Sequence, residues 1–110
     1  MSEIKLYNED CLNMMSEIQD NSIDLICTDV PYKITPKGGV SNMGGIYKKS
    51  NTLKGKIFNF NDIKPKEYLS EFYRILKEKT HCYIMINNLN LQEMLNEATK
   101  VGFHFVKCLI

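Results

Sequence analysis

Apolar residues recur along the chain at two spacings, which predict strands that alternate with helices. Short apolar runs are typical of strands, at 4–6, 23–28, 81–87 and 103–110. Apolar positions three or four residues apart predict helices, within 12–18, 68–76 and 91–98. This alternation predicts an α/β fold with a mostly parallel sheet of about four strands and flanking helices, because each right-handed crossover places its helix on the sheet.

Residues at the ends of these segments support the predicted helices. Asp10 and Asn90 have the side chains of N-caps for the first and last helix, and Gly102 is suited to end the last one. Pro65 is tolerated in the first turn of the middle helix, where its missing N–H is not needed.

The composition is that of one globular domain, residues 1–110, with 44% hydrophobic and 25% charged residues. No apolar run approaches the roughly 20 residues that cross a bilayer, and the N-terminus lacks the order of a secretory signal. We therefore expect a cytoplasmic protein without a membrane partner. The cysteines are widely separated, and His81 and His104 lack partners at metal-ligand spacing. Reduced, mostly buried thiols and no metal site are expected, and Cys27 is expected to be a buried cysteine of its strand.

Positive charge is concentrated in one segment, although the net charge is only +1. Residues 1–29 carry seven acids against one lysine, whereas residues 30–56 carry six lysines and no acid. Five of the six glycines lie in the same basic segment. This composition predicts a basic, glycine-rich mobile loop at 33–61. A loop of this length is either functional or solvated chain, and both interpretations stay open.

The segment Asp29-Val30-Pro31-Tyr32 directly follows an apolar strand and carries the strongest chemical signal. Pro31 has a fixed φ and restricts the residue before it, so the carboxylate, the local carbonyls and the ring are held in one relation. A carboxylate and a carbonyl accept hydrogen bonds from an exocyclic amine, while an aromatic ring stacks on a planar base. Ligands of parallel sheets bind beyond the carboxyl ends of the strands. The segment predicts a site for a planar substrate with an amino group.

This segment resembles the Asp-Pro-Pro-Tyr motif of amino-group DNA methyltransferases that use S-adenosylmethionine, in the class whose catalytic motif precedes its cofactor motif. The resemblance spans nearly the whole chain, including N-E-D-C-L near the start, the helix around 67–77 and the strand around 81–85. Val30 stands where the family has its first proline, and the family's glycine-rich cofactor turn is absent. The chain therefore resembles the first part of such an enzyme, as a truncated product or a fragment.

The resemblance implies a partial Rossmann-like methyltransferase fold and the transfer of a methyl group from S-adenosylmethionine to a flipped base in DNA. Asp29 would orient the amine, Pro31 would supply the rigid turn, and Tyr32 would stack on the base. Asp10 matches an acidic position that contacts the cofactor, although a helix N-cap is an equally good interpretation, and Asp29 borders the same pocket. An initial aspartate in the motif favours adenine as the target.

The resemblance also suggests a role for the basic loop, as a flap that closes over the flipped base. Its candidate contacts to DNA phosphates are Lys33, Lys37, Lys48 and Lys49. The alternative function is a catalytically inactive methyltransferase-like module that binds nucleic acid or a partner chain, and methylation of RNA or of a protein amide is a third possibility. The apolar final strand further suggests self-association or a missing C-terminal half.

Overall fold

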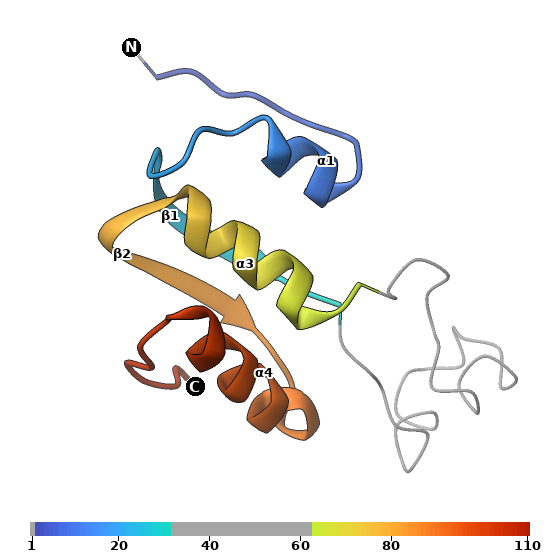
Figure 1. The fold of residues 1–110 in the computed structure, drawn as a ribbon. Coiled ribbons are helices and arrows are strands. Elements are labelled where there is room, and N and C mark those ends of the chain that lie inside the picture. Colours follow the sequence, from blue (N-terminus) through green and yellow to red (C-terminus); the bar gives the residue numbers. More distant parts are fainter. Residues whose placement is uncertain (1, 32–62) are drawn as a thin grey trace, which may run out of the picture.

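The computed structural model describes residues 2–31 and 63–110 as an α/β arrangement of helices and parallel strands (Figure 1). Its elements in chain order are α1 (Cys11–Ser16), β1 (Ile23–Asp29), α3 (Pro65–Ile75), β2 (Leu76–Met85) and α4 (Asn88–Val101). In this part of the chain the sheet has two strands, and β1 pairs with β2 in parallel. The α/β class and the parallel pairing predicted from the sequence are confirmed.

The strand β1 follows the apolar run 23–28, in which β-branched residues favour an extended chain. The strand β2 begins earlier than the predicted 81–87, at Leu76. Its pairing with β1 is irregular at first: Ile23 pairs with Leu76, whereas Leu25 already pairs with His81. From there the register is regular up to Asp29 and Met85. The extra residues of β2 form a bulge, which hydrophobic periodicity does not reveal.

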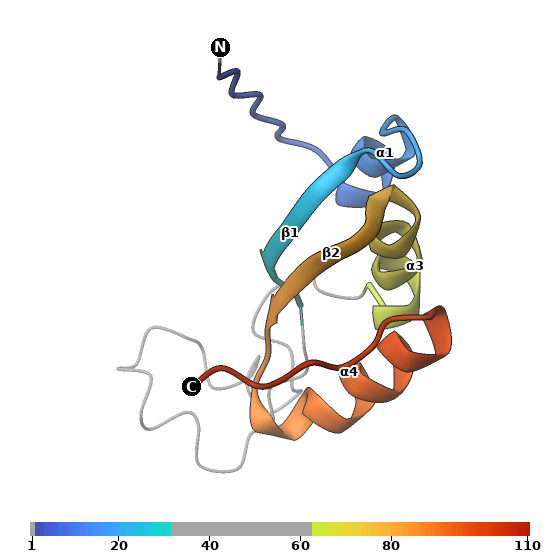
Figure 2. The ribbon, with the colours of Figure 1, turned by 90° about the vertical axis from the view of Figure 1, so that its left-hand side faces the viewer.

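The helices pack on one face of the sheet and enclose the core with it (Figures 1 and 2). The buried side chains of this core come from every described helix and from the end of β1: Met15, Val30, Tyr68, Leu69, Phe72, Ile75 and Met94. Half-buried residues of the strands pack against it, among them Ile26 and Ile84. The predicted helix stripes therefore face the core, which is where an amphipathic helix gains most of its stability.

Arg74 ties the start of the fold to α3. Its guanidinium donates hydrogen bonds to the carbonyls of Met15 at 2.7 Å and Ile18 at 2.8 Å, and it also contacts the carboxylates of Asp20 and Glu71. Hydrogen bonds to these two carboxylates raise the pKa of Arg74 above its ordinary value. One cation thereby satisfies carbonyls at the end of α1 and holds that helix over α3.

Two predicted strands are wrong. Residues 2–10 and 103–110 form no strand in the structure, and Ile4 and Leu6 are 86% and 92% exposed. A strand requires a neighbour for its N–H and C=O groups, and these segments pair with neither β1 nor β2. The described part of the sheet therefore shows two strands instead of about four.

The last helix begins earlier than expected. Asn87 is its N-cap, and the Asn87 Oδ1 accepts a hydrogen bond from the backbone N–H of Asn90 at 3.0 Å. The predicted cap, Asn90, therefore lies inside the first turn. Both asparagines have the chemistry of a cap, so the residue type alone does not select one of them. Within the described ranges, no helix is long and apolar enough to cross a membrane.

Candidate active site

Asp29 stands at the carboxyl end of β1, where it pairs with Met85 at the end of β2. Its side chain is exposed, whereas the next residue, Val30, is buried in the core beside α3 and α4. Pro31 follows, half-buried. The alternation of a strand explains this arrangement, because neighbouring side chains point to opposite faces. The buried Val30 side chain fixes this part of the chain to the core, and the exposed Asp29 carboxylate can accept hydrogen bonds from a ligand.

Asp10 caps α1, as the sequence indicated. Its carboxylate accepts hydrogen bonds from the backbone N–H groups of Leu12 at 2.9 Å and Asn13 at 3.4 Å. Figure 1 shows α1 running in the direction opposite to β1, so its first turn lies toward the same end of the molecule as the carboxyl end of β1. The prediction that Asp10 is the N-cap of this helix is confirmed. The predicted contact of Asp10 with a cofactor stays a prediction.

The remaining predicted site residues lie outside the described ranges. These are Tyr32 and the lysines of the basic segment, Lys33, Lys37, Lys48 and Lys49. The predicted loop at 33–61 lies there as well. Of the predicted catalytic set, the structure therefore positions Asp29 and Pro31.

Tyr68 is a polar residue of the core that the sequence analysis treated only as apolar. The residue is 2% exposed, and its hydroxyl has no hydrogen-bond partner in the described part of the chain. Burial, and after it the charge of Glu93, raises the pKa of Tyr68 to about 12. A buried phenol costs folding energy unless its hydroxyl is bonded. In sequence, its position on the apolar stripe of α3 concealed this property.

The cysteines nearest to the site differ in environment. The expected burial of Cys27 is wrong, because its side chain lies on the exposed face of β1. Cys82 is half-buried on β2 and packs against the core. Burial, followed by the nearby Cys27, raises the pKa of Cys82 to about 11. Cys82 is therefore an unreactive thiol at neutral pH. Among the described residues, no group of three or more His, Cys, Asp and Glu side chains could hold a metal ion.

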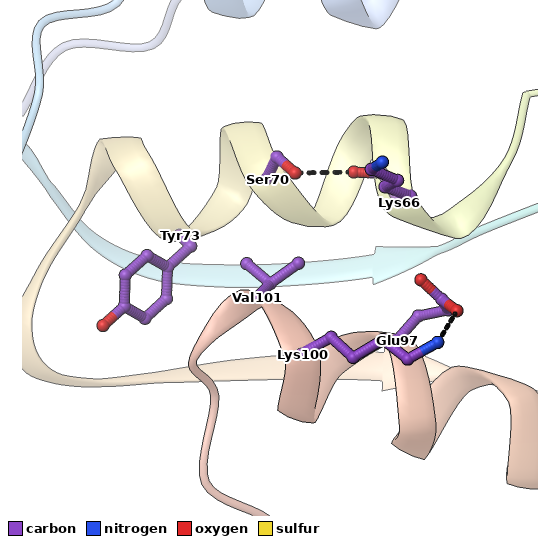
Figure 3. A pocket seen from close by; sticks show the side chains of 6 residues that line it. All are labelled: Lys66, Ser70, Tyr73, Glu97, Lys100 and Val101. Atoms are coloured by element: carbon purple, nitrogen blue, oxygen red, sulfur yellow. Dashed lines mark hydrogen bonds and ion pairs between the residues drawn. The ribbon is translucent and has the colours of Figure 1, made fainter.

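A groove of about 690 Å³ separates α3 from α4 (Figure 3). Six residues line it: Lys66, Ser70, Tyr73, Glu97, Lys100 and Val101. Its polar groups are largely satisfied, since Lys100 pairs with Glu97 at 3.0 Å and Ser70 donates a hydrogen bond to the Lys66 carbonyl at 2.7 Å. The groove lies between helices and is not lined by Asp29, so it does not extend the candidate site.

A parallel α/β sheet with a carboxylate, a buried valine and a proline at the end of one strand has the arrangement of α/β proteins, which bind ligands at that edge. Comparison with known proteins gives a more specific class. In an alignment 98 residues long that covers 78% of the chain, the sequence is 30% identical to the type II methyltransferase M2.MboI of Moraxella bovis. Over 30 residues, or 27% of the chain, it is 53% identical to the type II methyltransferase M.BglII of Bacillus subtilis.

The chain is thus similar to type II methyltransferases, and it spans only part of them. The match covers 32% of the length of M2.MboI and 8% of M.BglII. No family model and no solved structure matches the chain.

Proposed function

We propose that residues 1–110 carry part of the catalytic site of a DNA methyltransferase that transfers a methyl group from S-adenosylmethionine to the exocyclic amine of adenine. The observation that carries this proposal is the exposed Asp29 carboxylate at the paired end of β1, with Val30 buried behind it and Pro31 after it. The similarity to two type II methyltransferases supports the reaction class. The choice of adenine rests on the resemblance of Asp29-Val30-Pro31-Tyr32 to the motif that begins with aspartate.

In this reaction the residues of the chain act on the amine. The Asp29 carboxylate and a carbonyl near Pro31 accept hydrogen bonds from the two N–H groups, which directs the nitrogen lone pair toward the methyl group. Tyr32 stacks on the face of the extruded base. In the transfer an N–C bond would form at the amine as the S–C bond of the donor breaks, S-adenosylhomocysteine would be the leaving group, and the proton lost by the amine would pass to water near the exposed Asp29 carboxylate. No covalent bond to the protein is needed.

The described residues fit part of the methyl donor. S-adenosylmethionine supplies an electrophilic methyl group when bound. The Asp10 and Asp29 carboxylates have the chemistry to accept hydrogen bonds from its hydroxyl and amino groups. The chain contains no glycine-rich G-x-G-x-x-G turn. The described residues thus supply hydrogen-bond acceptors for the donor.

The test is methyl transfer to a DNA duplex with the Asp29→Asn protein, measured by mass spectrometry of the digested DNA. We expect a loss of at least about 100-fold, the range that general acid–base and orienting groups contribute. Asp24→Asn is a matched control, because Asp24 is an exposed carboxylate of the same strand that pairs with Lys77 at 2.7 Å. Full turnover in Asp29→Asn would contradict the assignment, and methylated cytosine in place of N6-methyladenine would contradict the target base.

The proposed DNA contacts are tested separately. Reversing the charge of Lys48 and Lys49 should weaken DNA binding for all sequences and reduce the dependence of affinity on salt, because fewer counterions are released. Unchanged affinity would exclude these lysines as phosphate contacts. DNA binding without any methyl transfer would favour the alternative, an inactive module.

A further inference from the structure

The two strands of the described sheet end side by side, and polar residues stand at both ends. Asp29, the last residue of β1, pairs with Met85, the last residue of β2. From Met85 the chain passes through Asn87 and Asn88 into α4. Figures 1 and 2 show the end of β1 and the start of α4 at the same end of the molecule. Asn87 and Asn88 therefore belong to the edge of the sheet that carries the Asp29 carboxylate.

The fold uses these two asparagines differently. Asn87 is half-buried and caps α4, where its Oδ1 accepts hydrogen bonds from the backbone N–H of Asn90 at 3.0 Å and from the Asn90 side-chain amide at 2.6 Å. Asn88 is exposed, and its side chain has no hydrogen bond to the described residues. Capping accounts for an asparagine at position 87. No contact within the described part of the chain accounts for the one at position 88.

A base that has left the DNA stack presents the edge that it used for pairing. In adenine this edge has two neighbouring groups, the amino group, which donates hydrogen bonds, and the ring nitrogen N1, which accepts one. An ionised carboxylate only accepts, so Asp29 can bind the amine but leaves N1 without a donor. An acceptor that loses its water without gaining a donor weakens binding. Recognition of adenine at this edge therefore requires a hydrogen-bond donor beside the carboxylate.

Asn88 carries such a donor, because its side-chain amide has two N–H groups. Its neighbours at the edge do not, since Met85 and Ile86 have apolar side chains and Pro31 lacks even a backbone N–H. We propose that the Asn88 amide donates a hydrogen bond to N1 of the adenine whose amine Asp29 binds. This inference rests on the proposed function, because it adds a second contact to the base which that function requires.

The test is binding of the nucleoside adenosine to residues 1–110, followed by nuclear magnetic resonance of the side-chain amides. We expect the amide signals of Asn88 to shift as adenosine is added. Asn88→Ala should weaken binding about three- to tenfold, the effect of one hydrogen bond. The analogue 1-deazaadenosine, which has C–H in place of N1, should bind the unmodified chain as weakly as adenosine binds Asn88→Ala. It should show no further loss in Asn88→Ala.

Two variants separate a contact with the base from an effect on the fold. Asn88→Asp keeps the size of the side chain and removes the donor, while an acid in the first turn favours a helix. We therefore expect weaker adenosine binding with an unchanged or higher melting temperature. Asn96→Ala is the matched control, since Asn96 is an exposed asparagine further along α4 whose Oδ1 accepts from Gln92 at 3.0 Å. It should change the affinity less than about twofold.

Equal affinities for adenosine and 1-deazaadenosine would overturn the proposal, and so would the absence of adenosine binding. Loss of binding in Lys64→Ala in place of Asn88→Ala would also overturn it, because the donor would then be the exposed ammonium group at the start of α3. The proposed function fails separately: Asn88-dependent binding of adenosine without methyl transfer to DNA retains the contact and contradicts the activity.

Discussion

Replacing Tyr68 with phenylalanine removes one oxygen atom from the core and leaves the ring in place. The ring of Tyr68 packs against that of Phe72, with centroids 5.5 Å apart, and this contact survives the change. The hydroxyl has no hydrogen-bond partner among the described residues, although it is fully enclosed. The Tyr68→Phe variant therefore isolates the energetic effect of one buried polar group.

The sign and size of the effect follow from this geometry. A buried hydroxyl without a hydrogen-bond partner destabilises the fold by about 1–3 kcal/mol, so its removal is stabilising. The small cavity left by the oxygen atom loses packing contacts and offsets part of this gain. We expect Tyr68→Phe to raise the free energy of unfolding by about 1 kcal/mol, which corresponds to roughly 4–8 °C in the melting temperature of a domain of this size.

The pH dependence of the free energy of unfolding tests the burial of the Tyr68 hydroxyl independently. The pKa of Tyr68 is raised to about 12 in the folded chain, first by burial and then by Glu93, against an ordinary value of 10. The folded state favours the neutral phenol of Tyr68. The contribution of this preference to stability is complete below pH 10 and is lost as the pH rises toward 12. The phenylalanine variant has no such group, and its advantage should grow across that interval.

Urea denaturation at pH 7.5 and pH 11 measures both effects. Tyr73→Phe is a suitable control, because Tyr73 is a half-exposed tyrosine of the same helix. It should leave the stability at pH 7.5 nearly unchanged. Loss of 1 kcal/mol or more in Tyr68→Phe would refute the reasoning, since it would show that the hydroxyl has a partner after all.

Three further changes test the packing of the fold. Gly102→Ala should destabilise by about 1–2 kcal/mol in thermal melts, because Gly102 has φ +127° and an added Cβ would lie 2.9 Å from the ring of Tyr73; a neutral result would contradict that close approach. Leu69→Ala, at a fully buried position, should cost about 2–5 kcal/mol in urea unfolding, whereas Leu89→Ala should cost little. Asp10→Ala should lower the free energy of unfolding by about 1 kcal/mol, because the α1 cap is lost. Asp10→Asn should retain the cap, so an equal loss of stability in both variants would exclude capping as the cause.

Elements with a strong local pattern could be predicted from the sequence. The apolar stripe of α3 and the proline at its start are both local signals, and the structure has the helix at Pro65–Ile75. The same holds for β1, where an apolar run ends at a charged residue. These signals depend on neighbours a few residues away, which a sequence displays directly.

Elements that depend on distant partners could not be predicted in this way. Residues 4–6 and 103–110 have the composition of strands, but a strand exists only when another strand accepts its hydrogen bonds. The bulge of β2 likewise follows from its register against β1. Neither property is encoded by periodicity within one segment.

The candidate site likewise contains residues that could be predicted from the sequence and residues that could not. The position of Asp29 at the carboxyl edge followed from strand and loop order, and the structure has it there. The burial of Val30 was not predicted from the sequence, where Val30 was noted only as the residue in place of the family's first proline. Tyr32 and the lysines lie outside the described ranges and stay predictions. Tyr68 could not be recognised, because a tyrosine on an apolar stripe looks the same whether or not its hydroxyl is bonded.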